Sequence, residues 1–121
     1  MDTRTKIVAA GHVPQGTTVV TGTFDVILAA DAKELSEIRA QHPENALCVV
    51  VLPLAGELLA QRARAELAAA LRMVDYVVIA DDPAPDAMLA ALKPARIVRL
   101  EGVHALRKRQ LTEHVQSRQT R

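Results

Sequence analysis

The chain has 121 residues, half of them apolar, and a formal net charge of +1. This length is typical of one domain, and no polar stretch is long enough to separate two cores, so we expect a single domain over residues 1–121. No run approaches the roughly 20 apolar residues of a membrane span, and the N-terminus carries no apolar signal segment, so we expect a cytoplasmic protein. The single cysteine, Cys48, excludes an intrachain disulfide framework.

Charge is divided unevenly along the chain. Residues 1–92 hold 7 basic and 12 acidic side chains, whereas residues 93–121 hold 8 and 2. A basic segment of this kind is typical of contact with phosphates or an acidic protein partner, and the alternative is a helix that docks on its own acidic domain. Nucleic acid is not an expected partner, because the chain has one Phe, one Tyr and no Trp to stack on bases.

The first half of the chain alternates between strand and helix patterns. After a lead-in over residues 1–16, the β-branched run 17–21 predicts a buried strand that ends at Gly22. Residues 31–41 carry apolar side chains at helical spacing, which predicts an amphipathic helix. The continuous apolar run 46–52 predicts a second strand, buried on both faces.

A helix over residues 56–73 is predicted next, followed by a third strand over 76–80. We expect Arg64 to lie away from the apolar face of this helix. That face is predicted to consist of Ala60, Ala63, Leu67, Leu71 and Val74. The sequence 81–83, Asp-Asp-Pro, is typical of a turn that also caps the next helix.

The last third of the chain predicts a short helix that starts near Pro85, a fourth strand over 95–100 and a basic C-terminal helix over 102–121. The apolar side of the final helix is expected to carry Val103, Leu106, Leu111 and Val115. The basic side chains of this helix that we expect to be exposed are Arg107, Lys108 and Arg109.

Strands that alternate with helices predict an α/β fold: a Rossmann-like three-layer α/β/α sandwich with a parallel sheet. Ligands of such sheets bind beyond the carboxyl ends of the strands, near the point where the strand order reverses. The expected site therefore lies in the loops that follow Thr21, Leu52, Ala80 and Leu100.

Two short motifs resemble signatures of one enzyme family. The segment 22–25, Gly-Thr-Phe-Asp, stands between the first strand and the first helix, and the segment 72–75, Arg-Met-Val-Asp, closes the second helix. Together they resemble the cytidylyltransferase-like nucleotidyltransferases, of the ADP-heptose synthase and glycerol-3-phosphate cytidylyltransferase types, over about residues 17–100. The resemblance implies a nucleotidyltransferase-like fold and, where binding is retained, CTP or ATP with Mg²⁺ as ligand. The residues it implies in binding are Gly22, Thr23, Phe24, Asp25, Arg72 and Asp75.

The catalytic part of the family pattern is degenerate in this chain. The H-x-G-H positions fall on Leu28, Ala29, Ala30 and Asp31, so both imidazoles are absent. Asp31 places a negative charge where the triphosphate would lie, and it suits the N-cap or first turn of a helix instead. After the second strand, the family's polar and lysine-bearing loop is replaced by Pro-Leu-Ala at 53–55. The resemblance therefore implies no catalytic residue.

These observations favour a domain that has lost catalysis and acts as a binding or regulatory module, including self-association as a homo-oligomer. The alternative is a weak or altered transferase that moves CMP or AMP from CTP or ATP to a phosphorylated small molecule. In the alternative, phosphates would be held by Arg72 and Asp75 together with basic residues of the tail such as Arg107, Lys108 and Arg109. In the non-catalytic interpretation, Arg72 and Asp75 form a structural ion pair and cap. No metal site is predicted, because the spacing of the ligand-type side chains does not suit one. These side chains are His12, His42, His104, His114 and Cys48.

Overall fold

A computed structural model describes residues 2–25 and 29–119, with side chains through Glu113. Its centre is a four-stranded parallel sheet with the strand order β3-β2-β1-β4. The strands are β1 (Thr18–Gly22), β2 (Leu47–Val51), β3 (Tyr76–Ile79) and β4 (Arg96–Arg99). The predicted α/β sandwich with a parallel sheet is confirmed.

The two central strands are buried along their whole length, as the continuous apolar run in β2 predicted. Val20 lies opposite Val49 in the register between β1 and β2, and opposite Val98 in the register between β1 and β4. Cys48 faces the interior of the protein with no exposed surface, and this burial raises the pKa of its thiol to about 12. Cys48 is therefore a core residue.

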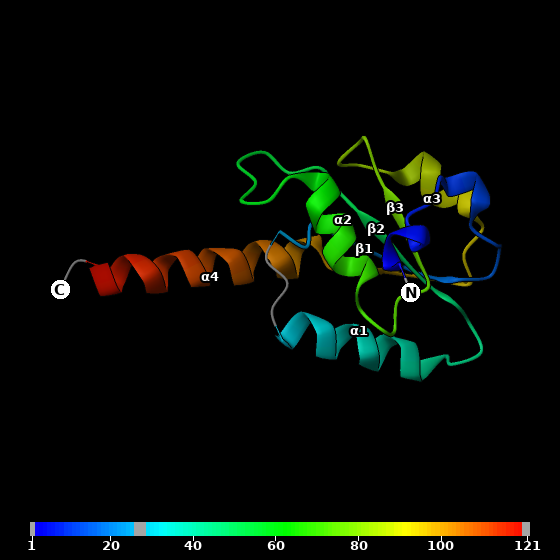
Figure 1. Cartoon of the computed structure of the whole chain (residues 1–121), viewed down its shortest axis with the longest axis horizontal. Helices are drawn as coiled ribbons and strands as arrows, with labels where there is room; N and C mark the ends of the chain where they lie inside the picture. Colours follow the sequence, from blue (N-terminus) through cyan, green and yellow to red (C-terminus); the bar gives the residue numbers. More distant parts are fainter. Residues whose placement is uncertain (1, 26–28, 120–121) are drawn as a thin grey trace.

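Helices cover both faces of the sheet and complete three layers (Figure 1). Helices α1 (Ala29–Gln41) and α2 (Gln61–Ala69) contribute to one apolar cluster with the sheet side chains of Val20, Val49 and Val77. Helix α3 (Asp86–Leu92) and the 3₁₀ turn Ala10–His12 lie on the opposite face, over Val19 and Val50. Another 3₁₀ turn, Thr3–Lys6, precedes a single parallel bridge between Ile7 and Val77.

Helix α2 is shorter than the predicted helix and faces the other way. It begins at Gln61 because residues 53–60 form a loop, in which Gly56 adopts a φ of +69°. Leu67, expected in the core, is 46% exposed, whereas Arg64 is completely buried. The buried positions of α2 are Arg64, Ala65, Ala68 and Ala69. The predicted face was wrong within α2 because it treated Arg64 as a surface residue. Leu71 and Val74, which follow the helix, do pack in the core as predicted.

The turn after β3 forms as predicted, since the Asp82 carboxylate accepts a hydrogen bond of 2.8 Å from the Ala84 amide. It does not cap the following helix: the N-cap residue of α3 is Pro85, and no side chain caps it. Helix α3 ends at Leu92: the C-cap residue Lys93 adopts the left-handed conformation, and Pro94 prevents continuation.

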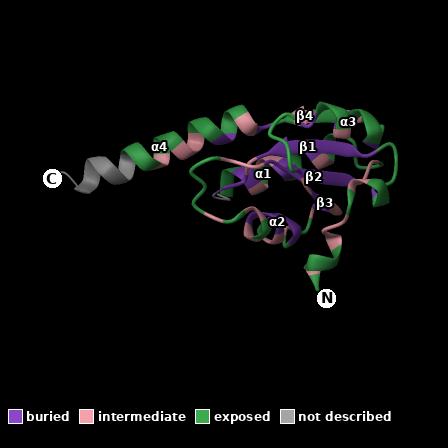
Figure 2. Cartoon of the chain, turned by 90° about the horizontal axis from the view of Figure 1, so that it is seen from above, coloured by how far each residue is buried: buried purple, intermediate pink, exposed green. Residues whose placement is uncertain are grey.

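Helix α4 (Glu101–Gln119) starts at the carboxyl end of β4 and projects away from the sheet (Figures 1 and 2). The predicted apolar side of this helix is wrong for Val103 and Leu106, which are 38% and 49% exposed. The side chains of α4 that instead face the body of the domain are His104, Arg107, Lys108 and Leu111. None of the described helices combines the length and hydropathy needed to cross a bilayer.

Candidate functional site at the carboxyl edge of the sheet

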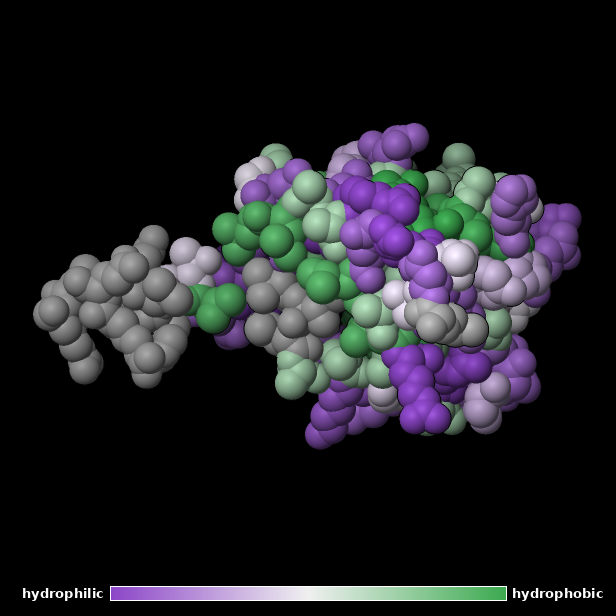
Figure 3. Space-filling view, viewed as in Figure 1, coloured by the Kyte–Doolittle hydropathy of each residue, from purple (hydrophilic) through white to green (hydrophobic). Residues whose placement is uncertain are grey.

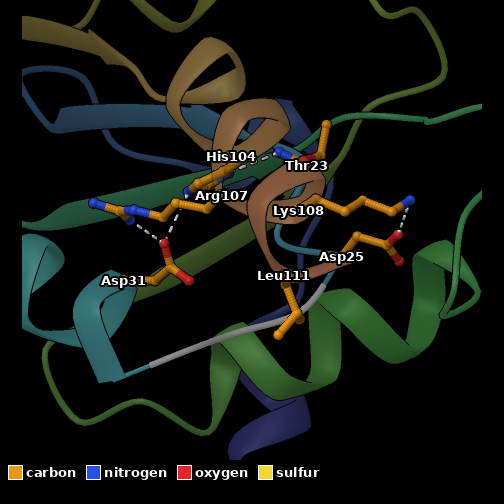
Figure 4. Close-up of a pocket in the computed structure, with 7 residues that line it drawn as sticks. All are labelled: Thr23, Asp25, Asp31, His104, Arg107, Lys108 and Leu111. Atoms are coloured by element: carbon orange, nitrogen blue, oxygen red, sulfur yellow. Dashed lines mark hydrogen bonds and ion pairs between the residues drawn. The ribbon is translucent and has the colours of Figure 1, made fainter. Parts of the chain in front are cut away.

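The candidate site lies where the strand order reverses. β1 pairs with β2 on one side and with β4 on the other. The strand order therefore reverses at β1, and a ligand site is expected beyond the carboxyl end of that strand. Thr23, Phe24 and Asp25 follow β1, and the first two turns of α4 follow β4 (Figure 4). The structure thus brings together Gly22–Asp25 of the family-like motif and the basic C-terminal helix, which lies outside the segment of family resemblance.

An imidazole from α4 lies against the loop that follows β1. Nδ1 of His104 accepts hydrogen bonds from the backbone N–H groups of Thr23 and Phe24, at 3.2 and 3.3 Å. The His104 and Phe24 rings meet edge to face with their centroids 4.4 Å apart. His104 is only 6% exposed, so this contact is part of the packed interior.

The backbone of the loop is shaped for this imidazole. A Cβ atom on Gly22 would lie 2.5 Å from Cε1 of His104, so only glycine permits the approach. Phe24 adopts a φ of +49°, an uncommon conformation for a bulky residue. The strained Phe24 backbone places two consecutive N–H groups toward the same ring nitrogen.

Next to the imidazole, an ionic cluster joins α4 to the first turns of α1. The Arg107 guanidinium pairs with the carboxylate of Asp31 and, at 3.2 Å, with that of Glu34 (Figure 4). The Asp31 side chain is 4% exposed. The expectation that Asp31 occupies the first turn of a helix is confirmed. Ala29 and Ala30 of the degenerate H-x-G-H positions lie in the same turn, and Leu28 lies outside the described residues.

A second ion pair holds the loop after β2. The Asp25 carboxylate contacts Nζ of Lys108 at 2.6 Å and accepts hydrogen bonds of 2.9 Å from the backbone N–H groups of Leu58 and Leu59. Burial opposes ionisation of Asp25, but the bond from Lys108 and the two backbone bonds outweigh it and lower the pKa of this carboxyl. Asp25 is therefore committed to internal contacts.

The loop after β2 is also fixed by Arg64. The guanidinium donates to the carbonyl oxygens of Thr23 and Leu52 at 2.7 and 2.8 Å. It also donates to the Leu59 carbonyl at 3.1 Å and pairs with the Glu57 carboxylate at 2.7 Å. This buried arginine joins the ends of β1 and β2 to the loop, a role that its helical position did not reveal.

Asp31, Glu34 and His104 form the geometry of a metal site without its chemistry. One ligand atom from each lies within 4.8 Å of the others. However, Nδ1 of His104 accepts two backbone hydrogen bonds, so the neutral ring carries its proton on Nε2 and offers no lone pair there. Nε2 lies 3.6 Å from the Asp31 carboxylate, and Arg107 already pairs with both acids. The three residues therefore do not fit a cation.

Arg72 and Asp75 are not part of this edge. The Asp75 carboxylate accepts a hydrogen bond of 2.8 Å from the Leu47 amide, at the amino end of β2. The ion-pair partner of Asp75 is Arg39 of α1, not Arg72 as the sequence suggested. Arg72 is exposed beside the same surface as Arg39. Of the six residues implied in binding, the structure brings four together and places the other two at the opposite edge.

Sequence reasoning missed Arg64 and His104 as residues of the site. It named Arg107 and Lys108 only as exposed basic side chains that could hold phosphates, and it missed their ion pairs with Asp31 and Asp25. One signal was present for the three of these residues that lie on α4. Positions 104, 107, 108 and 111 recur at the i, i+3, i+4, i+7 spacing of a helix face. A basic face at this spacing, following an acidic body, is consistent with a helix that docks through ion pairs. These contacts agree with the alternative given in the sequence analysis, in which the basic helix docks on its own acidic domain.

We expect stability to fall as the pH drops from 7 to 5, because of His104. Burial and the nearby Arg107 hold the pKa of His104 below its ordinary value of 6.5, although Asp31 opposes them. The unfolded chain therefore binds this proton more readily, and the stabilisation is complete above about pH 6.5 and decreases below it. Urea unfolding at pH 7, 6 and 5 measures the effect. The pH slope should decrease in His104→Gln and persist in the exposed control His12→Gln.

The fold and its strand order define a parallel, three-layer α/β protein. No family model matches the chain, and no curated protein matches it. Among solved structures, it is similar to the lipopolysaccharide core biosynthesis protein from Thermoplasma volcanium GSS1, with 17% identity and a TM-score of 0.60. The similarity covers 69% of this chain and 94% of that one. At this identity the likeness shows a shared fold.

Proposed function

We propose that this chain is a nucleotidyltransferase-like domain that has lost catalysis and acts as a binding or regulatory module. The proposal rests on one observation: an ion pair within the chain occupies the first turn of α1. Asp31 lies there with Arg107 of α4. In the family that the sequence resembles, the corresponding turn provides imidazoles to the nucleotide phosphates. Here it presents a carboxylate, which repels a phosphate.

The neighbouring contacts support the same proposal. Lys108 pairs with Asp25, and the His104 imidazole is packed against backbone amides. Transfer of a nucleotidyl group depends on cationic groups that stabilise the charge of the transition state. At this edge, Arg107 and Lys108 pair with acidic side chains of the domain and so hold α4 in place. The fold shared with a protein of lipopolysaccharide core biosynthesis is consistent with a biosynthetic scaffold put to another use.

The test is pyrophosphate release from CTP and from ATP, each with Mg²⁺ and with glycerol 3-phosphate or a sugar phosphate as acceptor. We expect no rate above that of the protein-free reaction. Turnover proportional to protein concentration would contradict the proposal and support the weak transferase.

Two variants identify the source of any rate. Arg72→Ala abolishes turnover if the amino edge holds the phosphates. Gly22→Ala forces His104 away from the loop after β1, so it abolishes turnover that depends on the carboxyl edge. A rate that survives both variants belongs to a contaminant and leaves the proposal in place.

A further inference from the structure

A groove runs beside the ionic cluster, between the base of α4 and the loops that follow β2 and β3. Its volume is about 620 Å³, within the range of small-molecule sites. The floor is mainly apolar and is formed by Leu52, Pro53, Leu54, Pro83 and Ala105. Figure 3 shows hydrophobic side chains gathered where the loop after β2 approaches α4.

The polar groups along this groove are mostly engaged within the domain. Nζ of Lys108 contacts Asp25 at 2.6 Å and the Gly56 carbonyl at 3.1 Å. The Glu101 carboxylate accepts a hydrogen bond of 2.7 Å from the Thr21 hydroxyl. Arg109 is exposed at the groove and has no ion pair among the described side chains. The groove therefore presents one available cation next to an apolar floor.

This combination defines the chemistry of a ligand. An apolar body gains from leaving water against the floor, and a single anion gains from the Arg109 guanidinium. A nucleoside triphosphate suits the groove poorly, because its several negative charges would meet one free cation and the Glu101 carboxylate.

We propose that the groove binds a small aromatic or branched aliphatic molecule with one anionic group, a carboxylate or a phosphate monoester. The inference rests on the proposed function, because it names the class of ligand that the proposed binding module would take. Gly102 also lines the groove, and a Cβ at this position would meet no atom within 4 Å. The side of the groove formed by α4 is therefore open to a ligand.

The test uses two fluorescent probes that differ by one charge. 1-Anilinonaphthalene-8-sulfonate has an aromatic body and one anion, and N-phenyl-1-naphthylamine is its uncharged counterpart. We expect saturable binding of the sulfonate at one site. Arg109→Gln should weaken the sulfonate about tenfold and leave the uncharged probe nearly unchanged. The exposed Arg62→Gln is the matched control.

A second variant tests the location of the probe. Ala105→Phe fills the groove from an exposed helical position, so it should abolish binding of both probes. Ala90→Phe makes the same change at an exposed position of α3 that does not line the groove. A common urea midpoint for all four variants shows that probe binding does not report unfolded protein. Sulfonate binding unchanged by both Ala105→Phe and Arg109→Gln overturns the proposal.

Competition identifies the anion and separates this proposal from the preceding one. 1-Naphthoate and 1-naphthyl phosphate should both displace the sulfonate, and the more effective competitor identifies the preferred group. CTP should displace it weakly. Failure of the sulfonate to bind, with no pyrophosphate release, overturns the groove and leaves the loss of catalysis standing. Pyrophosphate release with groove binding intact overturns the loss of catalysis alone.

Discussion

Arg64→Met is expected to lower the free energy of unfolding by about 3–5 kcal/mol, because several carbonyl oxygens lose their donor and each unsatisfied buried acceptor costs about 1–3 kcal/mol. The Arg64 side chain has no exposed surface, and its guanidinium makes bonds to three carbonyl oxygens and one carboxylate. Methionine retains apolar volume but leaves those acceptors without their donor. Urea unfolding at pH 7 measures the loss.

Two further variants test the cause. Arg64→Lys keeps the charge but cannot reach all four acceptors from a single ammonium, so its loss should be smaller than that of Arg64→Met. Arg62→Met removes an exposed pair with Glu66 and should cost about 0.5 kcal/mol or less. Equal losses for Arg62→Met and Arg64→Met would mean that Arg64 does not hold the loop in solution.

Arg107→Met is expected to destabilise the protein by about 2–4 kcal/mol and to release α4 from the body. The buried Asp31 carboxylate would lose its guanidinium partner, and the bond to Glu34 would be lost with it. Urea unfolding measures the stability. The rate of tryptic cleavage after Lys108 and Arg109 measures the release of α4 and should rise.

A double-mutant cycle isolates the ion pair from other effects of the substitution. Asp31→Asn combined with Arg107→Met should cost less than the sum of the two single changes, because the second change removes a charge whose partner is already absent. Arg109→Met, two positions along the same helix, should change stability by about 0.5 kcal/mol or less. Additive losses in the double variant would show that Asp31 and Arg107 do not interact in solution.

The order and type of the elements could be predicted because the apolar residues repeat at strand or helix spacing. The run at 46–52 became β2 (Leu47–Val51), and the helical pattern at 31–41 became most of α1 (Ala29–Gln41). Periodicity reports which side chains are apolar, and in these elements the apolar side chains are the buried ones. The parallel sheet and its three layers follow from that alternation.

The same reasoning was wrong where polar side chains are buried. In α2 the position nearest the ends of β1 and β2 belongs to Arg64, which satisfies carbonyl oxygens that an apolar side chain would leave unbonded. In α4 the docked face is formed by His104, Arg107 and Lys108, because the surface beneath it is acidic. A pattern based on hydropathy cannot distinguish a salt-bridged face from a solvated one.

The edge of the sheet that carries the candidate site was predictable, because the expected loops after Thr21, Leu52 and Leu100 contribute to it. The roles of single residues were predictable only in the loop after β1. The glycine and aspartate of that loop can be read locally, and the structure gives Gly22 and Asp25 specific roles there. The side chains of α4 that contact this loop, His104 and Lys108, lie about 80 positions away in sequence. Such a site depends on how the last helix docks, and a single sequence carries no direct record of that contact.

The place of β1 in the sheet has a consequence for the synthesis of the chain. Among the four strands of this sheet, β1 leaves the ribosome first, but its second neighbour, β4, ends only at Arg99. Until then one side of β1 presents unpaired backbone groups on an apolar strand, which other nascent chains can pair with. The site cannot form before α4 follows. The period of greatest risk of aggregation therefore lasts from the emergence of β1 until β4 and α4 emerge.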